Sequence, residues 1–517
     1  VAEALVENTK TYLRSRQGAV EPVIDAGVIQ NVIDCMLEAS GGAGDADAQD
    51  AARQGIEGLD LGDGVHIYNV TTDVRRFDYQ RATKEWVPSA AGAPGGGGGL
   101  FPPCEAKARV YCDRYHLLLQ RLLLEGRLVT EAEAMAGALL PGQRVLTPVE
   151  SLVGNPGRKL TFGLLSRGHD EQARRWAIED AHQVYPLDLE VPHADHLLTD
   201  GSFVLAEGEL VGGRLRVYSL EVPPAVPRGV SEEKDQVPAQ AFGGSLTDEQ
   251  LKVLAASEPD PGAMYVVLCE VHLDSARALE KLADVFRGYE ESAPPLVYVL
   301  MGSFCSTDFL PTAEGVRSYR EGFEQLKFMM RGLVNHVRRG TRFVFVPGPK
   351  DPGAQTLPRL PLSGYLTSDL ARDVPGVVLG TNPCRMRHCG QDLVFFRHDV
   401  LRLLRRHEAV PLRDPESGEA PSALYLRQEM VRFVFDQAHL VPLPLEESNI
   451  LWNFDHTLRL YPLPHAVFVG GVSQPFDYSY QGSTFCSVGP FHRDASFYAY
   501  YPATGLLESC DVPDRAG

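Results

Sequence analysis

The sequence is poor in three features that mark particular classes of protein. Its nine cysteines are scattered and none forms a CxxC pair, which predicts reduced intracellular thiols rather than disulfides or a zinc site. No apolar run approaches the ~20 residues that a membrane-spanning helix needs. Basic residues number 49 against 68 acidic ones, for a net charge of −19. This balance argues against a protein that holds DNA through its own phosphate contacts, but not against a subunit that a partner carries to DNA.

The length of 517 residues is too great for one hydrophobic core, so we expect several domains. Residues 1–40 have apolar residues at helical spacing and predict part of a helical domain. Residues 41–104 predict a flexible linker with a short extended segment, because they include a small acidic stretch and five consecutive glycines at 95–99.

Residues 105–227 predict a leading helix followed by a small β-barrel of the OB type. Short strands with turn residues between them are expected at Leu160–Leu165, Trp176–Ile178, Val184–Leu189, Phe203–Gly208 and Arg214–Tyr218. A surface that stacks bases needs positive charge and exposed aromatic rings, and this segment has few of either. A barrel without a nucleic-acid role is therefore favoured, with a single-strand DNA-binding module as the alternative. Residues 228–250 predict a linker.

Residues 251–517 alternate strands and helices and predict a large α/β domain. The apolar strands Leu296–Met301 and Arg342–Val346 flank a segment, 315–339, with apolar residues at helical spacing. This pattern predicts a βαβ unit with a buried parallel sheet. Ligands of such sheets usually bind where the strands end in loops, so the strand ends are the place to look for chemistry.

The residues at these strand ends resemble an altered set of phosphoesterase motifs. They are Glu270, His272, Ser303, Ser306, Pro349, Lys350, Asp351, His439, Gly471 and Ser473. Their order is similar to that of the calcineurin-like metallophosphoesterases, whose active members carry D-x-H, G-D-x-x-D, G-N-H-[DE], a lone His and G-H-x-H at these places. The resemblance implies a calcineurin-like α/β sandwich over 251–517.

The same resemblance implies that the phosphoesterase site is inactivated. Two close metal ions need a bridging carboxylate, flanking ligands and an Asn, and a nearby His protonates the leaving group. Here Ser303 stands at the bridging position, Pro349 at the Asn position and Lys350 at the position of the catalytic His. We therefore expect no catalytic residue, no metal ligand and no cofactor. The alternative is an active metal-dependent phosphodiesterase or nuclease on this scaffold.

Three of the candidate residues keep side chains that bind metal ions. Glu270, His272 and His439 are interpreted as a buried, hydrogen-bonded remnant of the site. A single, weakly held metal ion is the alternative, because histidines with a carboxylate form an acceptable ligand set.

Longer strings in the sequence resemble the B-subunit family of replicative DNA polymerases, and within it the epsilon branch. They include Arg342–Gly353, Leu357–Pro361, Thr381–Arg385, Gln391–Arg397 and His439–Pro444. The resemblance implies a noncatalytic scaffold of nuclear DNA replication whose barrel and phosphoesterase domains bind the cysteine-rich C-terminal domain of the polymerase epsilon catalytic subunit. It also implies that the N-terminal region docks on GINS in the CMG helicase, that DNA is contacted only weakly or indirectly, and that no membrane is bound.

Overall fold

A computed structural model describes most of the chain from Gly64 onward. The described residues are 64–80, 83–89, 102–124, 126–137, 139–167, 176–189, 194–244, 246–414, 417–471 and 474–513. The helices expected in 1–40 and the glycines at 95–99 lie outside the described residues. In the part that is described, no helix is both long and apolar enough to cross a membrane.

The expected βαβ unit forms the centre of a six-stranded sheet. Its order is β14-β13-β12-β11-β20-β21, with β11 (Tyr265–Cys269), β12 (Val297–Met301), β13 (Arg342–Val346), β14 (Val377–Leu379), β20 (Ser496–Tyr501) and β21 (Leu506–Asp511). Strands β11 to β14 are parallel, which confirms the prediction, and β20 joins β11 in antiparallel register. Every residue of β11 and β12 is buried, as expected for a sheet covered on both faces.

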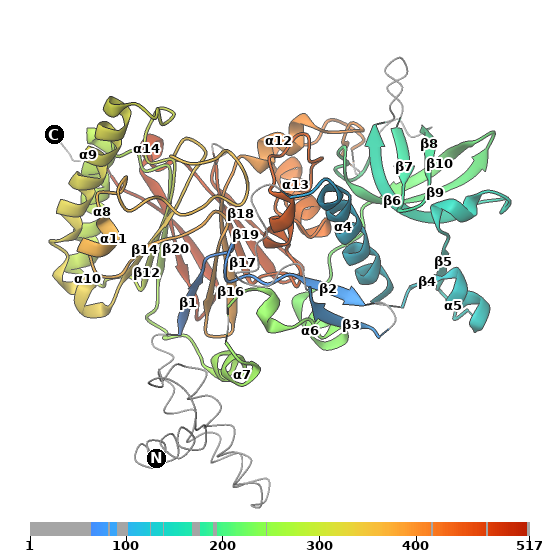
Figure 1. Cartoon of the computed structure of the whole chain (residues 1–517), viewed down its shortest axis with the longest axis horizontal. Helices are drawn as coiled ribbons and strands as arrows, with labels where there is room; N and C mark the ends of the chain where they lie inside the picture. The colour runs from blue at the N-terminus through green and yellow to red at the C-terminus, as the bar shows by residue number, and fades with distance from the viewer. Residues whose placement is uncertain are drawn as a thin grey trace, which may run out of the picture. The chain divides into compact units, whose positions relative to one another are not determined.

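A second six-stranded sheet packs face to face against the first (Figure 1). Its order is β1-β15-β16-β17-β19-β18, with β1 (Val65–Tyr68), β15 (Cys384–His388), β16 (Gln391–Arg397), β17 (Ala466–Gly470), β18 (Phe476–Tyr480) and β19 (Ser483–Val488). The core between the sheets contains fully buried side chains such as Val299, Phe395 and Phe468.

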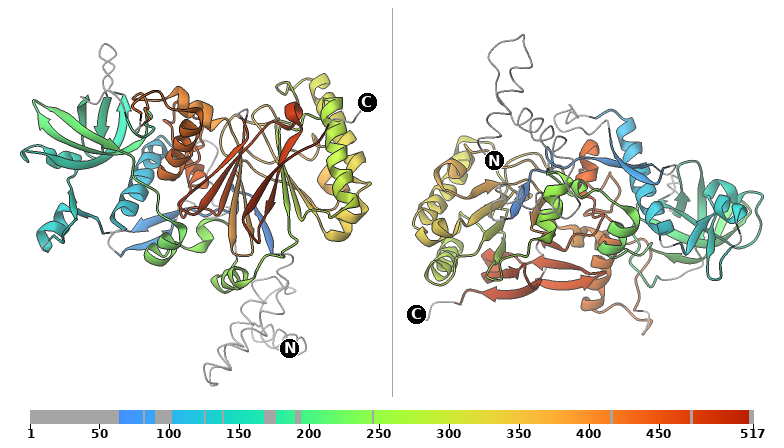
Figure 2. Two further views of the ribbon diagram at one scale, coloured as in Figure 1. Left: turned by 180° about the vertical axis from the view of Figure 1, so that it is seen from behind. Right: turned by 90° about the horizontal axis from the view of Figure 1, so that it is seen from below.

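Helices cover the outer faces of both sheets (Figures 1 and 2). The first sheet carries α8 (Ala276–Glu291), α9 (Ala313–Met330), α10 (Val334–Arg339) and α11 (Leu370–Asp373), and the second carries α12 (Val400–Arg406) and α13 (Ala423–Asp436). The short helices α14 (Phe491–Asp494) and η4 (Trp452–Leu458) lie in the loops. Ser275 caps the start of helix α8, because its hydroxyl accepts a hydrogen bond from the Ala278 amide. The helix buries Leu282 and Phe286 against the first sheet.

The expected five-stranded barrel is confirmed. Its strands are β6 (Lys159–Arg167), β7 (Trp176–Glu179), β8 (Val184–Leu189), β10 (Arg214–Glu221) and β9 (Phe203–Val211), and pairing of β6 with β9 closes it. No pattern in the sequence indicated the short strands β4 (Leu128–Thr130) and β5 (Arg144–Leu146), which extend this sheet from β6 and flank α5 (Glu131–Ala136). The turn η2 (Val149–Leu152) precedes the barrel.

The leading helix α4 (Glu105–Leu124) packs between the barrel and the sandwich. Its leucines 117–119 are buried in a cluster with Phe162 and Phe203 of the barrel and Ala438 of the sandwich. The barrel core in turn belongs to one hydrophobic cluster with α12 and α13. Barrel and sandwich therefore share buried surface rather than meeting only through a tether.

Two segments expected to be linkers contain more structure than that. In 41–104, β1 belongs to the second sheet, while β2 (Phe77–Gln80) and β3 (Glu85–Pro88) pair as a hairpin. In 228–250 lie α6 (Arg228–Asp235), η3 (Ala239–Ala241) and the start of α7 (Asp248–Ala256). The partner of β1 is more than 300 residues away in the chain, so no local pattern could have revealed this pairing.

Candidate functional site

The strand-end residue Glu270 opens the loop that follows β11. Its backbone has a left-handed φ of 55°, and its amide donates to the Met301 carbonyl at 2.8 Å, so the loop stays attached to the end of β12. The side chain of Glu270 is 5% exposed. A non-glycine residue in this conformation is uncommon, and here it turns a buried carboxylate toward the ends of the neighbouring strands.

The guanidinium of Arg397, at the end of β16, meets this carboxylate. It donates to Glu270 Oε1, through Nε to the Gly302 carbonyl at 2.7 Å, and through Nη1 to the Gly470 carbonyl at 3.1 Å and to Asp399 Oδ1 at 3.3 Å. Its side chain is 1% exposed. Arg397 therefore joins the ends of β11, β12, β16 and β17 in one buried cluster.

Gly470 leaves the space that this arginine occupies. A Cβ added at Gly470 would lie 2.6 Å from Cys269 Sγ and 3.2 Å from Arg397 Cδ. Gly470 is the glycine that opens the final G-H-x-H motif of the phosphoesterases, and the side chains of Cys269, Met301 and Arg397 pack closely against its backbone. The next motif position, Gly471, donates weakly to the Val488 carbonyl at 3.4 Å, and Ser473 lies outside the described residues.

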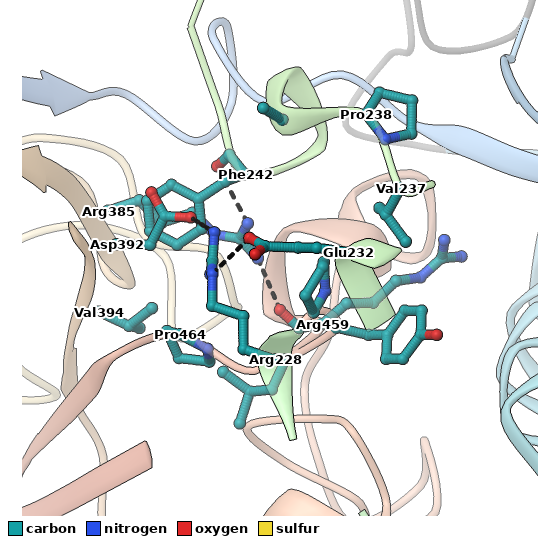
Figure 3. A pocket seen from close by; sticks show the side chains of 14 residues that line it. Arg228, Glu232, Val237, Pro238, Phe242, Arg385, Asp392, Val394, Arg459 and Pro464 are labelled. Carbon is teal, nitrogen blue, oxygen red and sulfur yellow. Dashed lines mark hydrogen bonds and ion pairs between the residues drawn. The ribbon is translucent and has the colours of Figure 1, made fainter. Parts of the chain in front are cut away.

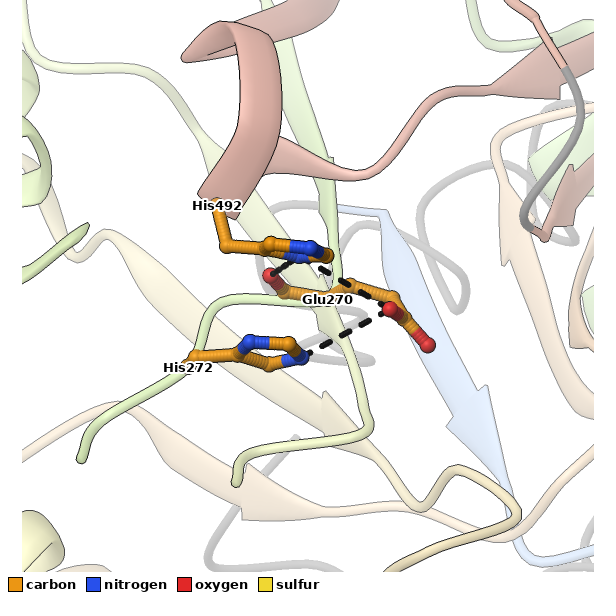
Figure 4. A group of neighbouring side chains, drawn as sticks. All are labelled: Glu270, His272 and His492. Carbon is orange, nitrogen blue, oxygen red and sulfur yellow. Dashed lines mark hydrogen bonds and ion pairs between the residues drawn. The ribbon is translucent and has the colours of Figure 1, made fainter. Parts of the chain in front are cut away.

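Two histidines stack beside the other oxygen of Glu270 (Figure 4). The rings of His272 and His492 are 3.8 Å apart and inclined by 13°. His272 Nε2 lies 3.5 Å and His492 Nδ1 3.7 Å from Glu270 Oε2. The three ligand atoms lie within 4.8 Å of one another and form the one such group found among the described residues.

The electrostatics of this cluster favour an ionised Glu270. Burial alone would raise the pKa of Glu270, but the neighbouring His272 imidazole and the charge of Arg397 outweigh it and lower that pKa to about 2. Burial and the neighbouring His272 lower the pKa of His492. At neutral pH the carboxylate is therefore charged and paired with the arginine.

The loop after β12 is held by hydrogen bonds to neighbouring loops. Ser303, at the bridging-carboxylate position, accepts from the Lys350 amide at 3.2 Å. The Lys350 ammonium donates to the Ser306 carbonyl at 2.7 Å, and the Ser306 hydroxyl donates to Asp274 at 2.6 Å. Ser303, Ser306 and Lys350 thus bind one another and the loop after β11. Pro349 adds no side-chain donor or acceptor.

Asp351 is fully buried among backbone donors. Its two oxygens accept from the Phe304 amide at 2.8 Å and the Gly348 amide at 2.7 Å, and the Tyr319 hydroxyl donates to it at 3.2 Å. A Cβ at Gly302 would lie 2.0 Å from its carboxylate. Burial outweighs these hydrogen bonds and raises the pKa of Asp351 to about 6.

The structure does not group His439 with Glu270 and His272, which corrects the expected remnant. His439 Nε2 lies 3.3 Å from Asp455 Oδ1 and from Arg114 Nη2, and Arg114 donates to Asp455 at 2.5 Å. Burial, together with the charge of Arg114, lowers the pKa of His439. His439 contributes to the contact between α4 and the sandwich, and His492 takes its place beside Glu270.

The donor set does not fit a two-metal centre. Ser303 and Gly471 supply no carboxylate or imidazole, and Asp351 is occupied by backbone amides. The lone pairs of an imidazole lie in the ring plane, so two parallel stacked rings cannot both direct a nitrogen at one ion. The Arg397 guanidinium adds a fixed positive charge at Glu270.

A separate cavity of about 180 Å³ lies between α6, η3 and the loop after η4 (Figure 3). Arg228, Arg385 and Arg459 line it, together with Asp392. Asp392 pairs with Arg228 at 2.6 Å and with Arg387 at 2.6 Å, while Arg385 donates to the carbonyls of Phe242, Thr457 and Arg459. The arginines that line the cavity therefore hold the surrounding loops in contact with one another.

Comparison with known proteins places this geometry in a family. The family model for the B subunit of DNA polymerase alpha/epsilon matches residues 265–478, and "DNA polymerase epsilon subunit 2-like, OB-fold domain" matches residues 104–224. The DNA polymerase epsilon B subunit of Arabidopsis thaliana is 32% identical over 448 residues, which are 84% of this chain and 81% of that protein. The chain belongs to the DNA polymerase epsilon B-subunit family.

Other members of the epsilon B-subunit family match over similar lengths. DNA polymerase epsilon subunit 2 of Bos taurus is 29% identical, covering 95% of this chain and 91% of its own, and that of Drosophila melanogaster is 30% identical, covering 89% and 85%. An archaeal phosphodiesterase structure aligns with 48% of this chain and 99% of its own at 6% identity, with a TM-score of 0.26, too low to support any argument.

Arg397 and His492 are the residues that sequence reasoning missed. Arg397 is the last residue of β16, so the rule that ligands bind at strand ends could have found it. His492 lies in α14, after β19, outside every motif of the phosphoesterase pattern. Its position beside Glu270 depends on the path of the segment that connects β19 of the second sheet to β20 of the first. No sequence motif predicts that path.

Proposed function

We propose that this chain is a noncatalytic scaffold subunit of nuclear DNA polymerase epsilon. In this proposal the barrel and the sandwich together bind the cysteine-rich C-terminal domain of the catalytic subunit. The N-terminal region links the polymerase to GINS in the replicative helicase. Membership of the epsilon B-subunit family supports the polymerase part of the proposal.

The observation that carries the noncatalytic part is the use of strand-end groups as internal contacts. Glu270 pairs with Arg397, Asp351 accepts backbone amides, and Lys350 donates to a loop carbonyl. A catalytic site needs such groups directed at a substrate or a metal ion. Here these groups form contacts within the protein itself.

A hydrolysis assay tests the loss of catalysis. With manganese and bis-p-nitrophenyl phosphate, we expect the purified chain to release no more nitrophenol than its Ser303→Ala variant. The double variant Pro349→Asn, Lys350→His should also stay inactive, because Ser303 and Gly471 still supply no ligand. Hydrolysis that a chelator abolishes, and that Glu270→Gln reduces, would show an active phosphodiesterase instead.

A pull-down experiment tests the scaffold role. The truncated chain should begin at Gly64, because β1 is paired with β15 and buries Val65 and Tyr68. A start near Leu100 would remove this edge strand. We expect residues 64–517 to retain the C-terminal domain of the catalytic subunit and to lose GINS, while the full chain binds both. An interface of this kind typically buries ~1,200–2,000 Å² or more.

The reverse outcome would contradict the assignment of roles. If residues 64–517 bound GINS and lost the catalytic subunit, the N-terminal region would be the polymerase contact. Circular dichroism of the truncated chain provides the control, since an unfolded fragment would lose both partners.

A further inference from the structure

We propose that the ends of β11, β12 and β17 form a buried cation site that the chain fills with its own Arg397, and that removing this charge creates a site for a divalent metal ion. This site lies within the chain itself, so its properties do not depend on the polymerase partner.

A ring of oxygen atoms surrounds the guanidinium of Arg397. Glu270 Oε1, Asp399 Oδ1 and the carbonyls of Gly302 and Gly470 all accept hydrogen bonds from Arg397. These acceptors come from four separate segments of the chain. Carboxylates and backbone carbonyls are also the ligands that hard divalent cations take in proteins.

The charges around Arg397 also favour a cation at this place. Two carboxylates, Glu270 and Asp399, face one guanidinium, and the side chain of Glu270 is 5% exposed. A buried carboxylate that loses its cationic partner carries a large desolvation cost. Removal of the Arg397 charge therefore leaves a strong driving force for capturing another cation.

The surroundings of Glu270 offer a further ligand and access from solvent. His272 Nε2 and His492 Nδ1 lie within 3.7 Å of Glu270 Oε2, on the side of the carboxylate that Arg397 does not use. Because their rings are stacked in parallel, only one of them can direct its nitrogen at an ion held by this carboxylate. Asp399, which supplies one of the oxygen atoms, is partly exposed, at 29% of its side chain, which gives an ion a route from solvent. A guanidinium is wider than a bare ion, but Mn²⁺ and Mg²⁺ usually keep several bound waters, which fill the difference.

Two variants that differ in charge test the proposal. Arg397→Gln removes the charge and keeps a polar side chain, whereas Arg397→Lys keeps the charge. Mn²⁺ binding is read from the loss of the free-ion electron paramagnetic resonance signal. We expect one bound Mn²⁺ and a higher melting temperature for Arg397→Gln, and no specific Mn²⁺ for Arg397→Lys or the wild-type chain.

Two controls assign the site. Glu270→Gln combined with Arg397→Gln should weaken Mn²⁺ binding on the order of tenfold or more, because a ligand is lost. Arg385→Gln removes another buried arginine, whose hydrogen bonds go to three backbone carbonyls. It should lower the melting temperature, and Mn²⁺ should not restore it.

Several results would overturn the proposal. One equivalent of Mn²⁺ bound by the wild-type chain would show that Arg397 does not fill the site. Equal Mn²⁺ binding by the Gln and Lys variants would show that charge is not the determinant. If Arg397→Gln folds only when expressed with added Mn²⁺, the proposal is supported. If it fails to fold with or without the ion, while Arg397→Lys folds, the site does not accept a metal.

Discussion

Two buried clusters of this protein contain the same kinds of side chain, an arginine, a carboxylate and a histidine, but they connect different parts. The strand-end cluster, Arg397 with Glu270 and His272, joins loops of the sandwich. The junction cluster, Arg114 with Asp455 and His439, joins helix α4 to the sandwich. The difference shows that one set of buried charges stabilises a domain internally, and the other fixes two domains together.

Further contacts reinforce the junction beside α4. Arg121 donates to the carbonyls of Pro223 at 2.7 Å and of Asp436. Gln437 exchanges two hydrogen bonds with the Phe203 backbone, at 2.8 and 2.9 Å. Barrel and sandwich should therefore behave as one rigid body, because separating them would leave several buried polar groups unpaired.

The largest loss of stability at the junction cluster is expected from Arg114→Ala. The change leaves Asp455 buried without its arginine, so the free energy of unfolding should fall by ~3–5 kcal/mol. Urea denaturation measures it. Arg109→Ala, at an exposed position on the same helix, is the matched control and should change stability by less than ~0.5 kcal/mol. An effect of Arg114→Ala as small as the control would show that the junction does not depend on these charges.

A smaller effect, with a defined pH dependence, is expected at Asp436 in the junction. Burial raises the pKa of Asp436 to about 6, despite the charge of Arg121. The folded state therefore binds this proton more tightly than the unfolded state does, and the ionised carboxylate costs stability at pH 7. That cost disappears as the pH falls from about 6 to about 4.

Asp436→Asn should remove this dependence. The amide oxygen of Asn can still accept from the Ala225 amide and the Tyr480 hydroxyl, which both bind one carboxylate oxygen. The stability of the variant minus that of the wild-type chain should increase by up to ~3 kcal/mol between pH 4 and 7. Denaturation at several pH values measures the difference, and a constant difference would contradict the raised pKa. Glu270 of the strand-end cluster contributes a pH dependence of the opposite sign, because its pKa is lowered and its ionised form stabilises the folded state.

The smallest effect is expected from a solvent-exposed pair at the same junction. Lys107 of α4 pairs with Glu446, and their side chains are 41% and 59% exposed. Lys107→Ala should cost less than ~1 kcal/mol, and less still in high salt. If Lys107→Ala lowered the free energy of unfolding as much as Arg114→Ala does, burial would not explain the difference between the exposed ion pair and the buried one.

The sequence predicted those parts of the fold that depend on local patterns. The barrel strands follow from short β-rich runs separated by turn residues, and the βαβ unit follows from two apolar strands around a segment of helical spacing; both are present. The resemblance to polymerase B subunits, based on long strings such as Arg342–Gly353, is confirmed by the family comparison. Strands β4 and β5 were missed because three-residue strands carry too few side chains to show a period.

The candidate site was predicted less completely, because its arrangement depends on contacts between distant segments. Motif order placed Glu270 and His272 at one strand end, where the structure has them. It also linked His439 to them, but His439 instead lies against Asp455 and against Arg114, 325 residues earlier in the chain. A motif gives the residue type at a position, whereas the neighbour of a buried side chain is decided by packing.

Strand β1 determines which part of the protein first bears a pulling force that is applied through the residues before Gly64. It pairs with β15 over four residues, from Val65 opposite His388 to Tyr68 opposite Arg385, and Arg385 and Arg387 of β15 hold loops near η3 and η4. Tension applied through residues before Gly64 would thus pass first into the sandwich and reach the barrel only through the buried junction. Under a pulling force, β1 is the element that should detach first, leaving the barrel and its attachments in place.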